Sequence, residues 1–506
     1  MRTAFLLVMI FCLNALAERP NIVFIFTDDH ACQSIGAYGS KINKTPNIDR
    51  LANEGGIFLN SFCANSICGP SRACILTGKH SHKNGFKKNG DGKFNGAQFT
   101  FPQVLQKNGY QTALFGKWHL GSNPTGFDAW EILPGQGSYY NPNLYTKDEK
   151  TKYEGYCTTV VTDLSLKWLD KRDKSKPFLL MCQHKAPHRS WSPDLKHLQN
   201  YKEDVPEPDT LFDTWENRSS TLAKNTMSIK NHFFWGWDMK IQMKVPFGTE
   251  WENKLKDGEY RRMTPEQKKV WDAHYKPLNE KFIKDAPTGK ELIRWKYQRY
   301  IKNYLRCIDS VDENVGRVLD YLDKNDLAKN TIVIYSSDQG FYLGEHGWYD
   351  KRWMFEESLK MPFIIRWPGK INPGSKFKQL IQNIDYAPTF LEACGVKVPQ
   401  DANIQGRSFI PLLGDTKAEF RDAIYYHYYE KGGHGVPMHE GVRDSRYKLI
   451  NFYDNDGLNL FDLEKDPKEM KDQSKNPEYQ EVLKTMKAKL EKLRNKYDLP
   501  PLPVKK

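Results

Sequence analysis

The stretch Asn21-Ile22-Val23-Phe24-Ile25-Phe26-Thr27 is a continuous apolar run, and Asp28-Asp29-His30 follows it at once. A run of this length and character is typical of a strand that is buried on both faces in a parallel sheet. Helical patterns such as 158–169 and 306–322 alternate with further runs of the same kind. The sequence therefore predicts an α/β fold with a mostly parallel sheet and helices on both faces. The other runs and the polar residues after them are Gln111–Phe115 with Lys117 and His119, Phe178–Cys182 with His184 and His188, and Thr331–Ser337 with Asp338 and Gln339.

The polar residues after these runs are expected to share one edge of the sheet, because ligands bind at the carboxyl ends of parallel strands. A single strand that ends in polar residues means little, since the chain is returning to water. Several such ends, all rich in groups that bind metals or anions, predict a common site. Asp28, Asp29 and Asp338 offer carboxylates, and Gln339 adds an amide oxygen. This all-oxygen set suits a hard divalent cation, with Ca²⁺ favoured over Mg²⁺ because the protein supplies many ligands. The alternative is that Asp28-Asp29 only cap a helix.

A second informative stretch is Cys68-Gly69-Pro70-Ser71-Arg72-Ala73-Cys74-Ile75-Leu76-Thr77-Gly78. Pro70 suits the first turn of a helix, Ser71 can cap it, and Gly78 is expected to end it. Cys68 then lies just ahead of a helix N-terminus, where negative charge is stabilised. This position fits a reactive group, although cysteine is also a common buried apolar residue.

The composition describes a globular chain. Its 506 residues are 39% hydrophobic and 27% charged, so we expect one large domain and one smaller one. The formal net charge of +13 favours an anionic partner or substrate, and it fits a solvated lysine-rich surface equally well. The sequence contains no nucleic-acid-binding motif, so nucleic acid is not expected as a partner. The 9 cysteines lack the paired spacing of a zinc site, and their disulfide pairing is left open.

The N-terminus has the three parts of a secretory signal peptide. Met1-Arg2 is charged, residues 4–13 are apolar, and Ala15-Leu16-Ala17 supplies small residues before Glu18. The apolar run is too short to span a bilayer, and no later segment is long and apolar enough to do so. We therefore expect residues 1–17 to be removed and the mature protein to be exported, either to the periplasm or out of the cell.

The remaining chain has regions of different character. Residues 18–417 carry the alternation of strands and helices and are expected to form the main domain. Within it, about 194–295 is less regular and rich in Trp and Lys, which predicts an irregular insertion near the mouth of the site. Its aromatic side chains either stack on sugar faces or pack inside the insertion. Short strand-like runs at 423–429, 441–452 and 458–463, with an amphipathic helix at 478–497, predict a small C-terminal α+β subdomain with an antiparallel sheet over 418–506.

Cys68-Gly69-Pro70-Ser71-Arg72 with Leu76-Thr77-Gly78 resembles the C-x-P-S-R then L-T-G signature of the formylglycine-dependent (type I) sulfatases, including bacterial polysaccharide sulfatases. The match is specific because it fixes both residue identity and spacing. The resemblance covers nearly the whole mature chain, least of all the insertion, and it implies an alkaline-phosphatase-like architecture with 18–417 as the catalytic domain. Further segments that resemble the family are Asp28-Asp29, Gly116–Gly121, Ala186–His188, Ser337–Gly340, Gly344–Gly347, 443–450 and Leu460–Leu463.

This resemblance also implies the chemistry. A separate maturation enzyme oxidises Cys68 to formylglycine (3-oxoalanine), and the hydrate of this aldehyde attacks sulfur and later expels sulfate. The implied metal ligands are Asp28, Asp29, Asp338, Gln339 and modified Cys68. The implied catalytic residues are Arg72, which orients the hydrate, Lys117 and Lys351, which bind sulfate, His119, the base that assists sulfate elimination, and His188, the acid that protonates the leaving alcohol.

Some positions depart from the family or stay open. Gln339 stands where many relatives have Asn, so the oxygen is kept on a longer side chain. His184 competes with His188 for the role of acid, since both follow the same strand, and we expect the other one to bind substrate or to form a structural hydrogen bond. His346 is a candidate substrate contact, with a structural place in its glycine-rich turn as the alternative.

The sequence thus predicts a calcium-dependent enzyme that hydrolyses sulfate esters on a sulfated carbohydrate. Ulvan, carrageenan, fucan and glycosaminoglycan remain open, as do the sulfated position and the choice between chain ends and internal units. The first alternative is a phosphatase or phosphodiesterase of the same fold, which would use Ser or Thr as nucleophile and commonly two metals. The second is a non-catalytic glycan-binding protein.

Overall fold

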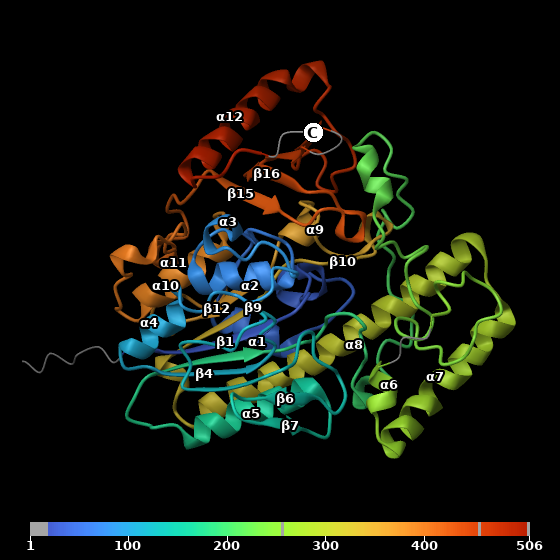
Figure 1. Ribbon diagram of the computed structural model, residues 1–506, viewed down its shortest axis with the longest axis horizontal. Coiled ribbons are helices and arrows are strands. Elements are labelled where there is room, and N and C mark those ends of the chain that lie inside the picture. Colours follow the sequence, from blue (N-terminus) through green and yellow to red (C-terminus); the bar gives the residue numbers. More distant parts are fainter. Residues whose placement is uncertain (1–18, 255–257, 454–456, 503–506) are drawn as a thin grey trace, which may run out of the picture.

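The computed structural model describes residues 19–254, 258–453 and 457–502 (Figure 1). The expected signal peptide, residues 1–17, lies outside the described residues. Among the helices of these three ranges, none combines the length and the apolar character that crossing a membrane requires.

The main sheet has 10 strands in the order β13-β2-β12-β9-β1-β8-β4-β5-β6-β7. Its centre is parallel and consists of β9 (Thr331–Ser337), β1 (Asn21–Thr27), β8 (Phe178–Gln183), β4 (Gln111–Gly116) and β5 (Ala129–Ile132). Every residue of β1, β8 and β9 is buried, which explains why their sequences are continuous apolar runs. The predicted mostly parallel sheet is therefore confirmed.

Short strands extend both edges of this sheet. On one side, β12 (Phe363–Arg366) pairs antiparallel with β9 and β2 (Gly56–Phe58), and β13 (Ser375–Phe377) pairs parallel with β2. On the other side, β6 (Asn143–Tyr145) and β7 (Lys150–Lys152) form an antiparallel hairpin. Two-stranded ladders outside this sheet join β3 (Ser61–Phe62) to β14 (Ile381–Gln382) and β10 (Tyr342–Leu343) to β11 (Tyr349–Asp350).

Helices cover both faces of the sheet (Figure 1). On one face α2 (Cys68–Thr77), α4 (Phe101–Lys107) and α10 (Tyr386–Ala393) pack together, with Phe24 of β1 against Tyr386 and Phe390. On the other face α5 (Cys157–Lys171) packs against the long α8 (Gly289–Lys324), which also contacts α1 (Pro46–Glu54). The shorter helices are α3 (Ser81–Asn84), α9 (Glu356–Leu359) and α11 (Ile410–Gly414).

The C-terminal region forms a separate antiparallel sheet of β15 (Ala423–Tyr428), β16 (His439–Asp444), β17 (Tyr447–Phe452) and β18 (Gly457–Asp462). Helix α12 (Gln480–Lys496) covers one face of it through Leu483, Met486 and Leu490. The run 441–452 is a hairpin of two strands, because the Asp444 carboxylate accepts the backbone N–H groups of Arg446 and Tyr447 and turns the chain. The predicted α+β subdomain is confirmed, whereas its boundary at residue 418 stays a prediction.

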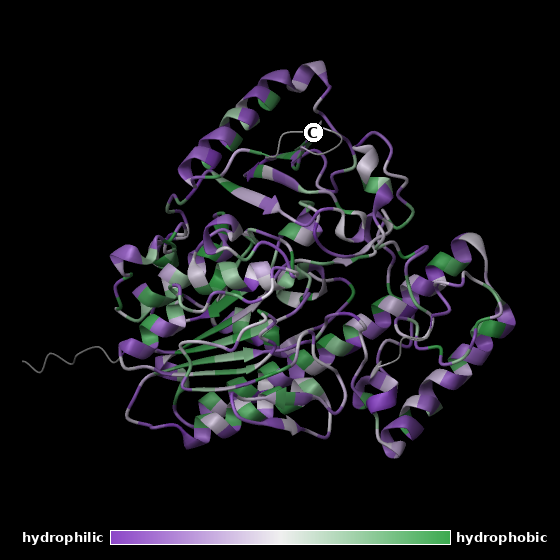
Figure 2. Cartoon of the chain, viewed as in Figure 1, coloured by the Kyte–Doolittle hydropathy of each residue, from purple (hydrophilic) through white to green (hydrophobic). Residues whose placement is uncertain are grey.

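The insertion is only partly irregular, which corrects the expectation for 194–295. Residues 198–254 contain little regular structure, but α6 (Gly258–Arg262), α7 (Pro265–Asp285) and the start of α8 are helical. Thr264 and Gln267 form a capping box at the start of α7. Figure 2 shows α7 as a mostly hydrophilic helix, and its buried side is a narrow stripe that includes Trp271, Tyr275 and Phe282. A stripe this narrow within a lysine-rich sequence gives a weak helical pattern.

Candidate active site

Helix α2 places Cys68 at the carboxyl edge of the sheet. Cys68 is the first residue of α2, and all residues of the helix are buried. Gly78 ends the helix with φ of 65°, as its sequence position predicts. Ser71 does not cap the helix, contrary to our expectation: its hydroxyl donates to the Asp338 carbonyl and accepts a hydrogen bond from Asn383 at 2.9 Å. The hydroxyl thereby ties α2 to the end of β9.

The predicted acidic residues come together because β1 and β9 are neighbouring parallel strands with Thr27 opposite Ser337. Oxygen atoms of Asp28, Asp29 and Asp338 all lie within 4.8 Å of one another. A second group, made of Asp28, Cys68 and His188, meets the same distance limit. The structure therefore joins the ends of three strands and the start of α2 in one cluster.

The free oxygen atoms of this cluster test whether it can hold a cation. Asp28 Oδ1, Asp29 Oδ2 and Gln339 Oε1 are buried and have no hydrogen-bond partner among the described residues. The Gln339 amide instead donates through Nε2 to Asp29 Oδ1 at 2.5 Å. Buried carboxylate oxygens without partners are costly, and oxygen atoms are the ligands that hard divalent cations prefer. The residues present therefore fit a divalent cation. Although the Gln339 side chain is longer than that of Asn, its amide oxygen still has no hydrogen-bond partner within the described chain.

Cationic side chains surround the acids. Lys117 pairs with Asp28, and Lys351 pairs with Asp29 Oδ1 at 2.5 Å. The Arg72 guanidinium binds Asp338 Oδ2 with two N–H groups, at 3.0 and 3.1 Å. Arg72 is held further by the Lys117 carbonyl at 2.7 Å and by the Gln183 side chain at 3.0 Å. Its direction is therefore set by neighbours from three separate strand ends.

Burial controls the protonation of these groups. It raises the pKa of Asp29 to about 7 against the opposing effect of Lys351, and it lowers the pKa of Lys117 well below the usual value. Burial also raises the pKa of the Cys68 thiol to about 12, although Lys351 lowers it. A thiol with this pKa stays protonated at neutral pH and is a poor nucleophile. The cysteine as encoded is thus badly suited to attack.

The structure separates the two histidines that follow β8. His188 lines the cavity above Cys68, with Nε2 at 3.8 Å from Asp29 Oδ2 and Nδ1 at 2.7 Å from the Arg189 carbonyl. Since a carbonyl only accepts hydrogen bonds, Nδ1 carries the proton and Nε2 faces the site. His184 is fully buried, and its Nε2 lies 3.6 Å from Cys182 Sγ. The cavity lining in the described chain does not include His184, so the geometry favours His188 as the acid.

The other predicted histidines differ in position. His119 has φ of 56° and its carbonyl lies beside Gly69 of α2, while burial and then Lys117 lower its pKa to about 2. It is therefore a neutral side chain close to the site. His346 is fully buried and its Nδ1 lies 2.9 Å from Asp213, next to Arg218. It does not belong to the described cavity lining, so its predicted contact with substrate finds no support and the structural alternative fits.

The cavity above Cys68 has a volume of about 760 Å³. The insertion forms one wall of it through Phe234, Trp237 and Trp251, as expected for a segment near the mouth. Trp235 and Trp271 are buried inside the insertion, as the packing alternative predicts, whereas Trp237 and Trp251 face the cavity and their stacking on a sugar stays a prediction. Polar residues that the sequence did not single out also line the cavity: Asn89, Gln136, Arg189, His232, Asp350, Arg352 and His434. Only Asp350 and Arg352 carried a signal, because they flank Lys351.

A family model described as sulfatase matches residues 20–396, and one described as N-sulphoglucosamine sulphohydrolase, C-terminal, matches residues 344–496. The chain belongs to the sulfatase family. This sulfatase is 45% identical over 498 residues to an N-acetylglucosamine-6-O-sulfatase of Bacteroides thetaiotaomicron. The alignment covers 96% of this chain and 88% of that protein. It is also 27% identical to an ulvan-active sulfatase of Formosa agariphila, with 93% of this chain and 78% of that protein covered.

Solved structures agree. A sulfatase-fold chain in complex with its substrate, D-glucosamine-2-N,6-O-disulfate, superposes with a TM-score of 0.91 at 45% identity and covers 95% of this sulfatase and 98% of that chain. A phosphonate monoester hydrolase of Agrobacterium radiobacter shares the fold, with a TM-score of 0.69 at 20% identity over 95% of this chain and 96% of that one. The predicted sulfatase resemblance and α/β fold are confirmed, and the protein is a sulfuric ester hydrolase.

Proposed function

We propose that this sulfatase hydrolyses the 6-O-sulfate ester of a glucosamine unit in a sulfated saccharide. The observation that carries the proposal is the likeness at 45% identity, over nearly the full length of both chains, to an N-acetylglucosamine-6-O-sulfatase and to a structure bound to D-glucosamine-2-N,6-O-disulfate. The net charge of +13 and the aromatic wall of the cavity support an anionic sugar. This narrows the sequence-based choice to glucosamine-containing glycans such as glycosaminoglycans.

The nucleophile is inferred to be formylglycine made from Cys68 by a separate oxidative maturation enzyme. The C-x-P-S-R motif supports this, and so does the raised pKa of the buried thiol, which disfavours attack by cysteine itself. A hydrated aldehyde at this position offers two hydroxyl groups, one to attack sulfur and one to help release sulfate.

The cation is inferred to be Ca²⁺, with Mg²⁺ as the lesser alternative. Asp28, Asp29, Asp338 and Gln339 would hold it, together with the modified Cys68, and their free buried oxygens support this role. When bound, a divalent cation stabilises charge on sulfate oxygens and lowers the pKa of a hydroxyl group.

The side chains around Cys68 then have distinct tasks. Lys351, whose pKa Asp29 helps to raise, brings positive charge to the sulfate group. The negative charge of the bound ester raises the lowered pKa of Lys117, so that Lys117 joins it as a second cation. Arg72 keeps Asp338 and the reacting residue in place. His188 gives a proton from Nε2 to the leaving sugar oxygen, and the negative charge of the bound ester raises its pKa for this step. His119, which is neutral, accepts the proton from the second hydroxyl group when sulfate leaves.

The proposal is tested by measuring sulfate release from a panel of sugars. We expect activity on glucosamine-6-sulfate and on its N-acetylated and N-sulfated forms. We expect little activity on galactose-6-sulfate, or on N-sulfated glucosamine that has no 6-O-sulfate group. Phosphate esters in the panel test the phosphatase alternative, and faster phosphate than sulfate release would contradict the proposal. Mass spectrometry of the peptide that contains Cys68, from protein made with a maturation enzyme, should show formylglycine; active enzyme with cysteine alone would refute the mechanism.

We also propose that the mature enzyme is exported after removal of residues 1–17. The charged, apolar and small-residue parts of the N-terminus support this. N-terminal sequencing of the protein recovered from the periplasm and the medium should begin at Glu18, and intact Met1 in the cytoplasmic fraction would contradict it.

A further inference from the structure

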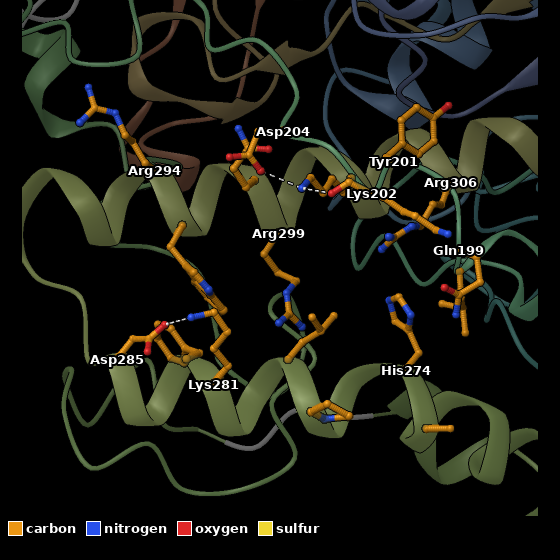
Figure 3. Close-up of a pocket in the computed structure, with 18 of the residues that line it drawn as sticks. Gln199, Tyr201, Lys202, Asp204, His274, Lys281, Asp285, Arg294, Arg299 and Arg306 are labelled. Carbon is orange, nitrogen blue, oxygen red and sulfur yellow. Dashed lines mark hydrogen bonds and ion pairs between the residues drawn. The ribbon is translucent and has the colours of Figure 1, made fainter.

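A second large cavity lies between α7, α8 and the segment 198–207 (Figure 3). Its volume is about 690 Å³, and it shares no lining residue with the described lining of the cavity above Cys68. Part of its wall is apolar, and this part consists of Leu198, Pro277, Leu278, Phe282 and Trp295. The rest of the wall is charged, with more cationic than acidic side chains.

The carboxylates that line this cavity already have cationic partners. Asp204 binds Lys302 at 2.9 Å and Asp285 binds Lys281 at 2.6 Å. Glu207 binds Arg294 at 3.2 Å. The charges of these six side chains therefore neutralise one another in pairs.

Arg299 and Arg306 are different, since neither forms an ion pair with any described acidic residue. Arg299 is 8% exposed and donates to the Met239 carbonyl and to Asn279, both at 3.1 Å. Arg306 is 6% exposed and donates to the Asn200 carbonyl and to Asn303. Two buried guanidinium groups that meet only neutral oxygens are costly unless an anion joins them.

A histidine opposite the arginines adds to this picture. In Figure 3, Arg299 reaches from α8 and His274 reaches from α7 into the space between the two helices. His274 Nε2 is buried and has no hydrogen-bond partner within the described chain. Burial and then the charges of Arg306 and Arg299 lower the pKa of His274 to about 4, so the cavity disfavours any further cation.

The apolar wall lies beside these polar groups. The Trp295 and Phe282 rings stack at 3.7 Å between centroids, and the Arg299 guanidinium lies 5.0 Å from the Trp295 ring. Leu278 is 42% exposed in this wall. A flat apolar wall next to cationic groups matches a ligand with a hydrocarbon face and an anionic substituent, as an acidic sugar has.

We propose that this cavity is a second binding site for the sulfate or carboxylate group of an acidic saccharide, with the oxyanion on Arg299 and Arg306 and the sugar ring against Pro277 and Leu278. The choice of a saccharide rests on the proposed function, whereas the oxyanion site rests on the arginines alone. Inorganic sulfate shares the oxyanion chemistry, and the experiment separates the two sources.

The test is calorimetric titration of the full-length Cys68→Ala protein with a sulfated glucosamine–uronate tetrasaccharide. We expect two classes of site. Arg299→Gln and Arg306→Gln should each weaken one class about tenfold or more, because each removes a charge-assisted hydrogen-bond donor. Arg294→Gln is the matched control, since Arg294 lines the same cavity but is half exposed and paired with Glu207, and it should change the affinity less than about twofold.

A further variant guards against loss of folding. Leu278→Glu removes no hydrogen bond of the described structure and puts a carboxylate into the cavity wall, so it should abolish the second class of site without lowering the thermal midpoint. Turnover of glucosamine-6-sulfate by the Cys68-containing variants reports on the proposed function independently. A single class of site in the parent protein, or two unchanged classes in Arg299→Gln and Leu278→Glu, would overturn the proposal. Equal affinity for inorganic sulfate alone would overturn the saccharide as ligand.

Discussion

Neighbouring residues of one short segment, 238–240, contact the linings of both cavities of this sulfatase. The Asp238 carboxylate binds Arg189, which lines the active-site cavity, at 2.6 and 2.8 Å. The Met239 carbonyl accepts the hydrogen bond from Arg299 in the insertion cavity. In the active site, carboxylate and amide oxygens of Asp28, Asp29 and Gln339 have no hydrogen-bond partner within the described chain, which favours a cation. In the insertion cavity, Arg299 and Arg306 have hydrogen bonds to neutral oxygens but no ion pair with a described acidic residue, which favours an anion. The charge of the groups that lack an oppositely charged partner, more than the volume of the cavity, indicates which kind of ligand a cavity binds.

The largest expected effect on activity comes from replacing the residue that reacts with the substrate. Cys68→Ala should lower sulfate release on the order of 10⁴-fold or more, because it removes the reacting group. Cys74→Ala is the matched control, since Cys74 is buried in the same helix and contacts Ser81. It should keep activity within about threefold while lowering stability by about 1–2 kcal/mol. Equal losses in both variants would assign the effect to packing of α2.

Removal of metal tests the free oxygens directly. Dialysis against a chelator should abolish sulfate release, and Ca²⁺ should restore it better than Mg²⁺. Bound cation should also stabilise the fold, by about 2.7 kcal/mol at roughly 100 times its Kd, measured as a rise of the thermal midpoint. In Asp338→Asn the midpoint should no longer respond to Ca²⁺. A full response there would show that the ion binds elsewhere.

Replacement of the two histidines after β8 tests which one belongs to the active site. His188→Ala should lower kcat on a sugar sulfate about 100-fold, and less on an aryl sulfate whose leaving group needs no proton. His184→Ala should keep kcat within about threefold and lower the thermal midpoint, because His184 is buried beside Cys182. The reverse outcome would return the role of acid to His184.

The cluster of Asp213, Arg218 and His346 is a third case, in which the opposite charges already meet. Burial alone would raise the pKa of Asp213, but hydrogen bonds from His346 and Arg218 hold it below the usual value. A carboxyl whose pKa is lowered by folding stabilises the fold above the unfolded pKa of about 4, and this contribution is lost as pH falls towards the folded pKa.

Asp213→Asn should therefore cost about 1–2 kcal/mol in free energy of unfolding at neutral pH, and the difference from the parent should shrink below about pH 4. Urea unfolding at several pH values measures this. Asp148→Asn, at an exposed position, should show little change at any pH. Equal turnover by Asp213→Asn and the parent is expected, and a large loss of kcat would mean that His346 contributes to catalysis after all.

The centre of the sheet could be predicted from the sequence, because strands that are buried on both faces must be apolar throughout. For the same reason it placed Asp28, Lys117, His188 and Asp338 at one edge, since parallel strands end together. Helix α7 was not predicted, because its apolar stripe is narrow and Pro277 interrupts its sequence pattern.

The loop residues of the active site could not be predicted in the same way. Asn89, Gln136 and His434 reach the cavity from three separate loops, and the positions of loops depend on tertiary packing that no local pattern records. His184 and His188 also show what the sequence alone could not predict. Both follow β8, and only the folded chain shows that one turns to the cavity and the other into the core.

If Cys68 is converted to formylglycine as proposed, the burial of α2 sets an order of events during biosynthesis. Cys68 is 1% exposed and every residue from Cys68 to Thr77 is buried, so the folded protein offers a second enzyme no segment to grasp around the cysteine. An enzyme that oxidises Cys68 must therefore meet the chain while it is still extended, before α2 closes onto the sheet. Folding and maturation would then compete in time, and a chain that folds first would be sealed as an inactive thiol form.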